Sequence, residues 1–446
     1  MRITNSLLVL SIFFATCIPV FPQETFDLNK CITVGLERNF SIRIARNQQE
    51  IASNNYTTGN AGFLPSIDAT GRYGGTLNNT TSTYSFPRDS SGTVTGIHNT
   101  SASAGVGLTW TIFQGFNAIT SYKKLNELRM VGELNTQAAV EDFIADIVTE
   151  YYLYIQQIQL FRNLEYAVAL SRERVRIDQE RYLLGAASKL QLLQSQVYLN
   201  SDSSRYSRQK EVLRASQVRI NRLLAMDDPG HDIILSDSTI RIHNSLNYDS
   251  LLASTLKYNT SLQIAGRNQI ISEYDYKLVS SRSYPYLNLS TGYNFNLNEF
   301  ENSNLLKQQT DGFNYGLTMG INIFDGLNQK RNRQNARIEH NNRILASEQI
   351  LQQVKADLIT IYYGYQNNLL LLELETENLK TAEENLEIAL ERYKLGSLTG
   401  LELREVQQSL LEAEERLLLA QYQTKVAEIS LMQISGRIME YLGQAS

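Results

Sequence analysis

The chain has 446 residues, enough for two or three average domains, yet it contains only 6 Pro and keeps one polar texture throughout. Its formal charge of −5 and its pI of about 5.6 give no support to nucleic-acid binding, which usually requires a basic patch or stripe. The mild acidic excess bears only on solubility. Internal repetition therefore has to be tested before the chain is divided into domains.

Residues 1–22 have the layout of a secretory signal peptide, with an early Arg, an apolar run from Leu7 to Ile18 and then a Pro. A membrane anchor fits less well, because the run is shorter than the roughly 20 residues that a spanning helix needs. Cys17 is a poor lipid acceptor among its apolar neighbours, so we expect simple cleavage near Gln23. Cys31 would then be the only cysteine of the exported chain, which leaves no intrachain disulfide.

Alternation of apolar and polar residues begins directly after Pro65 and again after Pro285. The predicted strands span residues 66–76, 101–113, 286–296 and 312–324. One face of each strand is apolar and ends in aromatic residues, whereas the other carries small residues and amides with almost no charge. This pattern is typical of strands that face lipid on one side and a watery lumen on the other. An ordinary soluble sandwich is the alternative.

Four strands cannot close a barrel by themselves, since about eight are needed to enclose an interior. We therefore expect the apolar faces to meet lipid in an oligomer. The stretches 76–100 and 296–311 are rich in Thr, Ser, Asn and Gly, and are expected to be exposed loops that join the strands of each pair. His98 is expected to lie on the surface of the first loop.

Each strand pair is followed by about 70 residues without Pro, which predict one helix on the order of 100 Å long at about 1.5 Å per residue. Apolar residues recur at steps of three and four along these helices and along the helices that return from them. Such a pattern requires a partner helix. The expected long helices span 116–184 and 327–395, and the expected return helices span 188–225 and 400–442.

The two halves repeat one another. The turn Arg181-Tyr182-Leu183-Leu184-Gly185 recurs as Arg392-Tyr393-Lys394-Leu395-Gly396, at an offset of 392 − 181 = 211 residues. Asn39 and Leu64-Pro65 are echoed by Asn259 and Tyr284-Pro285 at an offset of 220, and the difference of nine residues is the difference in length of the two loops. We therefore expect four segments: a signal peptide (1–22), a first repeat (23–225), a connector (226–250) and a second repeat (251–446).

This order of elements, with the paired Arg-Tyr-x-x-Gly turns and the Phe-x-Gly strand exits at Phe113 and Phe324, resembles the outer membrane efflux family typified by TolC. The resemblance covers essentially all of the exported chain. It implies a mainly helical homotrimer with a twelve-strand membrane β-barrel and a coiled-coil tunnel in the periplasm. It also implies a channel that receives substrates from a periplasmic adaptor and an inner-membrane pump and passes them to the cell exterior.

The repeated turns are the first candidate site. Gly185 and Gly396 allow a positive φ that ends a helix, and Ser or Thr follows three residues later as a helix cap. A plain helical hairpin explains these residues on its own. The Arg181-Tyr182 and Arg392-Tyr393 pairs, expected to be exposed, resemble the tip that docks a periplasmic adaptor in the family.

The start of each return helix is the second candidate site. Glu402 and Glu405 stand where the family narrows the tunnel with acidic residues, and their spacing of three places both on one helix face. An ordinary solvated face is the alternative, with Arg404 as surface charge. The first repeat carries Gln191 and Gln194 instead. By resemblance to TolC, Gln191 would bond Tyr393, and Leu398 replaces a participating Arg.

No catalytic, cofactor or metal site is expected, because the four His are scattered without ligand spacing and no nucleophile or phosphate-binding motif occurs. Energy for transport would come from a partner in the inner membrane. Two alternatives stay open. The same channel could be the outlet of a type I protein secretion system, or the chain could be a secreted coiled-coil adhesin or scaffold without a pore.

Overall fold

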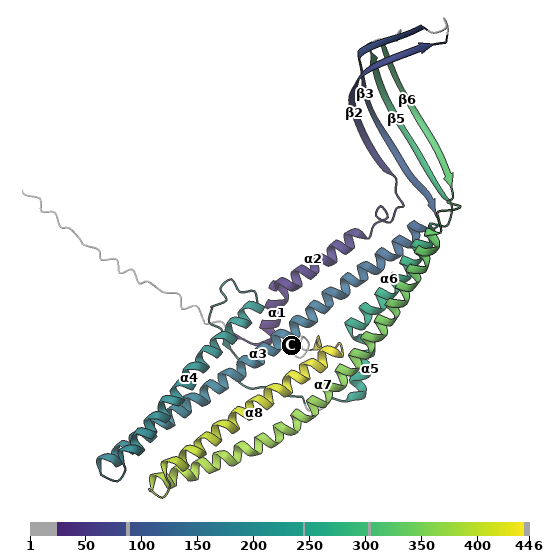
Figure 1. Ribbon diagram of the computed structural model, residues 1–446. Coiled ribbons are helices and arrows are strands. Elements are labelled where there is room, and N and C mark those ends of the chain that lie inside the picture. The colour runs from purple at the N-terminus through teal and green to yellow at the C-terminus, as the bar shows by residue number, and fades with distance from the viewer. Residues whose placement is uncertain (1–24, 86–89, 244–245, 302–304, 441–446) are drawn as a thin grey trace, which may run out of the picture.

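The structure is a computed structural model that describes residues 25–85, 90–243, 246–301 and 305–440. The predicted signal peptide and Cys17 lie outside these ranges. A curved sheet forms one end of the elongated molecule, and a bundle of long helices leads from it to two helical tips (Figure 1). The elements in chain order are β1 Thr25–Phe26, α1 Leu28–Arg38, α2 Phe40–Asn55, β2 Ser66–Tyr84, β3 Ser90–Gln114, α3 Asn117–Leu183, α4 Lys189–Leu223, β4 Ile234–Leu235, α5 Tyr248–Tyr258, α6 Thr260–Ser281, β5 Tyr286–Phe300, β6 Lys307–Gly320, α7 Asn328–Lys394 and α8 Gly400–Ile434.

The sheet contains the strand pair of each repeat. Its order is β2-β3-β5-β6, and every neighbouring pair is antiparallel. The central β3–β5 pair therefore joins the first repeat to the second. A mainly helical chain with two duplicated strand pairs confirms the fold class predicted from the sequence.

The strands of the first pair are longer than predicted. Most of the stretch 76–100, interpreted above as a loop, continues the ladder as far as Tyr84 and Ser90. Thr is β-branched and favours the extended backbone, and facing hydroxyls bond across the ladder, as Thr81 Oγ1 and Thr93 Oγ1 do at 3.0 Å. His98 consequently lies in β3 opposite Leu77 rather than in a loop.

The second pair differs from the prediction at both ends. β5 continues to Phe300 and β6 begins at Lys307, so the loop between them is shorter than expected. At its other end β6 stops at Gly320, although the apolar alternation runs on to Phe324. Residues beyond Gly320 have no ladder partner among the described residues, because β5 begins opposite Gly320, at Tyr286.

The long helices α3 and α7 each have 67 residues and confirm the helical interpretation, at about 100 Å each. The residue before each helix has a left-handed backbone, with φ of 62° at Phe116 and 64° at Leu327. The return helix α8 ends at Ile434, earlier than the expected 442. Gly436, with φ of 69°, donates its N–H to the Gln433 carbonyl and so turns the chain out of the helix.

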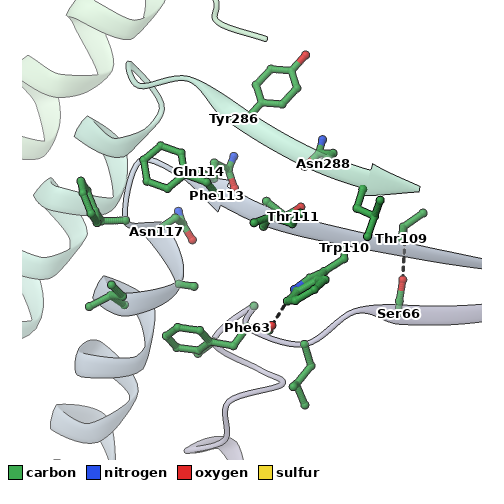
Figure 2. Close-up of a pocket in the computed structure, with 18 of the residues that line it drawn as sticks. Phe63, Ser66, Thr109, Trp110, Thr111, Phe113, Gln114, Asn117, Tyr286 and Asn288 are labelled. Carbon is green, nitrogen blue, oxygen red and sulfur yellow. Dashed lines mark hydrogen bonds between the residues drawn. The ribbon is translucent and has the colours of Figure 1, made fainter. Parts of the chain in front are cut away.

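The sheet meets the helices at a hollow of about 810 Å³ (Figure 2). The indole N–H of Trp110 donates to the Phe63 carbonyl at 2.9 Å, which ties the α2–β2 connection to β3. Phe113 and Phe116 pack edge to face, with ring centroids 5.3 Å apart. Aromatic side chains therefore fix the bend between strand and helix.

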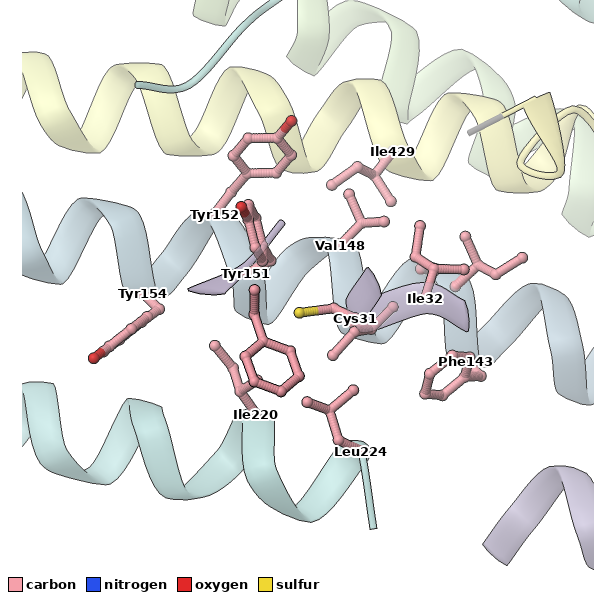
Figure 3. Packing of buried hydrophobic residues seen from close by; sticks show 14 of the residues in the cluster. Cys31, Ile32, Phe143, Val148, Tyr151, Tyr152, Tyr154, Ile220, Leu224 and Ile429 are labelled. Atoms are coloured by element: carbon pink, nitrogen blue, oxygen red, sulfur yellow. The ribbon is translucent and has the colours of Figure 1, made fainter. Parts of the chain in front are cut away.

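The main core lies midway along the bundle, where α1, α3, α4 and α8 meet (Figure 3). Tyr151 is completely buried there, and its hydroxyl donates to Asp237 at 2.7 Å. The duplicated Asn residues brace this region. The side-chain amide of Asn39 donates to the Leu223 carbonyl, and that of Asn259 donates to the Ile434 carbonyl, each at 2.9 Å.

Candidate functional site at the helical tips

Two helical hairpins form the tips at the end of the molecule opposite the sheet (Figure 1). In the first tip Gly185 has φ of 72°, and the N–H of Ala186 donates to the Arg181 carbonyl at 2.8 Å. This arrangement satisfies the last carbonyls of α3 without a side chain at the left-handed position. Gly396, with φ of 77°, ends α7 in the same way. Both turn glycines therefore have the backbone that the sequence predicts.

Each return helix begins with a capping box. The Ser188 hydroxyl accepts from the N–H of Gln191 at 3.3 Å, and the Gln191 side chain accepts from the Ser188 N–H at 3.0 Å. In the second tip the Glu402 carboxylate accepts from the Thr399 N–H at 2.8 Å and from its hydroxyl at 2.7 Å. These two bonds lower the pKa of the Glu402 carboxyl, and the bond from the Thr399 backbone N–H has the larger effect. Glu402 is therefore both a helix cap and an exposed charge.

The other two predicted aperture residues lie one turn further along the return helices. Glu405 on α8 and Gln194 on α4 are both exposed, as are Glu402 and Gln191. A spacing of three residues places Glu402 and Glu405 on one side of α8. The second tip therefore presents two carboxylates where the first presents two neutral amides.

The two tips are bonded to each other. The Arg181 guanidinium lies 4.6 Å from the centroid of the Tyr393 ring and donates to the Tyr393 carbonyl. The Tyr393 hydroxyl donates to Asp178, and burial followed by this bond raises the hydroxyl pKa above its usual range. The predicted Gln191–Tyr393 bond is wrong, because the Gln191 side chain is held in its own helix cap while Asp178 on α3 faces Tyr393.

These contacts correct the expectation that both Arg-Tyr pairs are exposed. Tyr393 is only 2% exposed, and Arg181 is half-buried against it. Tyr182 and Arg392 remain exposed, and exposed leucines such as Leu183 and Leu395 surround them. Of the two Arg-Tyr pairs, only Tyr182 and Arg392, which come from different repeats, are therefore available at the surface of the tips.

A second buried polar contact joins the repeats further from the tips. Asp202 on α4 is 1% exposed and accepts from both terminal nitrogens of Arg404 on α8, at 2.6 and 2.8 Å. The Ser171 hydroxyl also donates to Asp202, at 2.5 Å. The Tyr198 ring lies between two guanidinium groups, 5.0 Å from that of Arg404 and 4.9 Å from that of Arg174. Arg404 is therefore part of the interface and is not the surface charge that the sequence suggested.

The predicted site residues did not include Asp178, Asp202 or Arg174, although the sequence carries a signal for Asp202. On α4 the buried polar side chains recur every seven residues, at Ser195, Asp202, Gln209 and Ser216. Polar side chains at one heptad position of a packed helix predict a bonded interface. The positions 211 residues later carry Val406, Ala413, Ala420 and Ala427. The two repeats therefore share a shape while their buried faces differ in polarity.

Possible metal ligands are scattered over the residues that the structure describes. No group of three or more His, Cys, Asp or Glu among them is arranged to hold a metal ion. The four His lie apart: His340 contacts Ser272 at 2.9 Å, and His243 contacts Glu428 at 3.1 Å. Within the same ranges, none of the helices combines the length and apolar character of a membrane span.

Comparisons with known structures agree with this architecture. The CmeC outer membrane channel of Campylobacter jejuni is 16% identical with a TM-score of 0.75, over 94% of this chain and 89% of that chain. The outer membrane protein VceC of Vibrio cholerae is 16% identical with a TM-score of 0.72, over 92% and 96%. The open MtrE channel of Neisseria gonorrhoeae is 18% identical with a TM-score of 0.70, over 92% and 88%. At these identities the likeness shows the fold.

No sequence among curated proteins matches the chain. A family model does: the model for outer membrane efflux proteins matches residues 32–226 and 251–437, one match in each repeat. The two matches together cover most of the sequence. The chain therefore belongs to the outer membrane efflux protein family, as an outer membrane efflux channel protein that extends into the periplasm.

Proposed function

We propose that three copies of this chain close into a twelve-strand barrel and a helical tunnel, which conducts substrates from a periplasmic adaptor and an inner-membrane pump to the cell exterior. The open sheet carries this proposal. Within the described residues, β2 and β6 each have a single neighbouring strand, so both edges of the sheet need partners. Three sheets of four strands supply them and form a closed barrel of twelve.

The outer face of the sheet supports a lipid environment. Alternate residues on the strands are large, apolar and strongly exposed, with Tyr73 at 79%, Tyr315 at 82% and Met319 at 74%. The opposite face carries residues such as Thr318 and Asn288. An apolar patch of this extent on a single chain marks a contact with lipid or with another protein.

The tips are the proposed docking surface for the adaptor. Tyr182 and Arg392 are exposed, and an aromatic ring with a guanidinium among leucines has the composition of interface hot spots. In this proposal Arg181 and Tyr393 hold the tips in place, and Gly185 and Gly396 shape the turns. No catalytic step is assigned to the chain, and the inner-membrane partner supplies the energy for transport.

Glu402 and Glu405 are the proposed charge at the periplasmic aperture. In a trimer they form two rings of three carboxylates, while Gln191 and Gln194 add neutral positions between them. Rings of carboxylates favour cations at a pore entrance. Replacing both Glu402 and Glu405 by Gln should reduce cation selectivity in a planar bilayer. Unchanged selectivity would place the selective charge elsewhere in the channel.

Docking and pore formation can be tested separately. Cells that depend on this channel for ethidium efflux should accumulate the dye when Tyr182→Ala and Arg392→Ala are combined, because the adaptor contact is lost. The purified variant should still be a trimer with normal bilayer conductance. Tyr166→Ala is the matched control, since Tyr166 is exposed on α3 but lies away from the tip. Normal dye efflux in the double variant would reject the docking surface.

The alternatives make different predictions in the same assays. An outlet for type I protein secretion would form the same trimer and conduct ions, but its loss would block export of a protein rather than of ethidium. A coiled-coil adhesin or scaffold would give no bilayer conductance. Two strand edges that have no neighbouring strand among the described residues, together with the exposed apolar face, favour the channel over the scaffold.

A further inference from the structure

The polar face of the sheet carries two isolated charges. The even-numbered residues of β2 from Ser66 to Asn78, and the residues paired with them across β3, β5 and β6, share this face. In these described rows Asp68 and Arg72 are the only charged side chains, and most of the others are Gly, Ser, Thr, Asn or Gln. The large apolar side chains lie on the opposite face. Asp68 and Arg72 therefore face the lumen of the proposed barrel, away from lipid.

Neither charge has a counter-ion on the sheet. Both side chains are exposed, and neither forms an ion pair with a described residue. Charged groups on the other face do have partners, as Lys307 has in Glu299 at 3.2 Å. A second copy of the sheet would bring only the same two charges on its polar face, within the rows that the structure describes. Successive β2 strands of a twelve-strand ring are four strand positions apart, about 19 Å at about 4.8 Å per strand, so Asp68 of one copy does not reach Arg72 of the next along the wall.

In the proposed trimer each of the two charges recurs three times at one level of the barrel. The second repeat adds none, because the counterparts of Asp68 and Arg72 at the offset of 220 are Asn288 and Gly292. β2 leads away from the helices, so the Arg72 ring lies nearer the exterior (Figure 1). The rings are four residues apart, about 14 Å along the strand at about 3.4 Å per residue, which exceeds the screening length of about 10 Å in about 0.1 M salt. The two rings therefore act separately on ions in the lumen.

The wall around Arg72 leaves its guanidinium room to extend into the lumen. Its neighbour across the ladder is Ser103, and Gly74 follows it on the same face. A Cβ added at Gly74 would meet no described atom within 4 Å. Twelve strands spaced about 4.8 Å apart and tilted by about 40° place the backbone about 12 Å from the barrel axis. Three long side chains at one level therefore approach one another around the axis.

We propose that the three Arg72 guanidinium groups bind a multivalent organic anion in the outer part of the pore. This inference rests on the proposed trimeric channel and adds a substrate-binding position to it. A guanidinium offers five N–H donors that match carboxylate or phosphate oxygens, and rings of Arg favour anions in pores. Glu402 and Glu405 lie beyond α7, a helix of about 100 Å, so the pore carries opposite charges at its two ends.

Open-channel block in a planar bilayer tests this site with the full-length trimer. Inositol hexakisphosphate, added on both sides in about 0.1 M KCl, should block the current of the natural channel. The half-blocking concentration should rise at least about tenfold in Arg72→Gln, because three charge-assisted contacts are lost. Arg72→Lys is the matched control, since it keeps the charge at the same place, and should still be blocked. The double variant Glu402→Gln with Glu405→Gln should be blocked as the natural channel is.

Ion selectivity gives a second readout of the two rings. In a KCl gradient, Arg72→Gln should shift the reversal potential toward that of K⁺, and Asp68→Asn should shift it toward that of Cl⁻. The variant with Thr70→Arg and Arg72→Gln returns a guanidinium to the same face and should restore the block. Should Arg72→Gln fail to assemble by light scattering, Thr70→Arg in the natural chain decides in its place. It should lower the half-blocking concentration, because it adds a second guanidinium ring.

The outcomes separate this site from the channel itself. Normal conductance with unchanged block and selectivity in Arg72→Gln, or an unchanged half-blocking concentration in Thr70→Arg, would overturn the Arg72 site and leave the channel in place. A trimer that gives no conductance even in the natural chain would overturn the proposed function instead.

Discussion

Removing the carboxylate of Asp202 should loosen the helical tips. Asp202 is buried and accepts two bonds from Arg404, at 2.6 and 2.8 Å, and one from Ser171, at 2.5 Å. Asp202→Ala leaves the Arg404 guanidinium largely buried without its counter-ion, a change that costs about 3–5 kcal/mol when one partner of a buried pair is lost. Because the site lies between α4 and α8, the loss falls on the contact between the two repeats.

Hydrogen exchange followed by mass spectrometry is the appropriate assay, since it reports local opening of the helices that carry the tips. Amides of α4 and of the first half of α8 should exchange at least a hundredfold faster in Asp202→Ala, because each 1.4 kcal/mol changes an opening equilibrium about tenfold. The double variant Asp202→Ala with Arg404→Leu removes both charges and should restore most of the protection.

Glu180→Gln serves as the exposed control, because the ion pair of Glu180 with Arg176 is surrounded by solvent. That variant should leave exchange at the tips unchanged. If the amides of α4 and α8 in Asp202→Ala exchanged less than tenfold faster than those of the natural chain, the Asp202–Arg404 pair would not hold the repeats together.

Three further changes test other parts of the structure. The pKa of Glu414 is raised to about 7, first by burial and then by the neighbouring carboxylates of Glu383 and Glu415. The protonated form of Glu414 is therefore favoured in the folded chain, and the stability of the chain should fall as the pH rises from about 4.3 to 7. Glu414→Gln should therefore raise Tm at pH 8 but not at pH 4, and an equal effect at both would contradict the assignment. Glu428→Gln removes the carboxylate that lies 2.7 Å from the ammonium of buried Lys425, and should lower Tm. The variant that also carries Lys425→Met should recover, and a Tm as low as that of the single variant would refute the pairing. Gly185→Ala should destabilise the first tip by about 1 kcal/mol, because Gly185 has a positive φ. Gly364→Ala should stabilise α7 by a similar amount, because Gly364 lies in the helix interior with open space around it. If the tip amides lost protection from hydrogen exchange in both variants, or in neither, the role of the positive φ would be contradicted.

The duplication and the helical hairpins were predictable from the sequence because they depend on local chemistry. Gly185 and Gly396 end helices through a backbone preference, and the Ser188 and Thr399 caps act within one turn. The long runs without Pro predicted the first and last residues of helices α3 and α7 to within a residue or two. Each of these features is encoded in a short stretch of chain.

Contacts between the repeats were not predictable in this way. Tyr393 bonds Asp178 rather than Gln191, because the packing of α7 against α3 decides which acceptor the hydroxyl reaches. The Thr-rich stretch after residue 76 was interpreted as loop because Thr and Ser occur in both turns and strands, and only the partner strand decides between them. β6 was expected to reach Phe324 for a related reason: the alternation marks a strand, but within the described residues its ladder partner β5 begins only opposite Gly320.

In the proposed channel, three copies of this chain enclose one pore. Single-channel recording in a planar bilayer can detect this pore, with protein whose detergent-corrected mass is that of a trimer. We expect discrete conductance steps that prefer cations and that lose part of this preference in the Glu402→Gln, Glu405→Gln variant. A trimeric preparation that inserts into the bilayer and gives no conductance would contradict it.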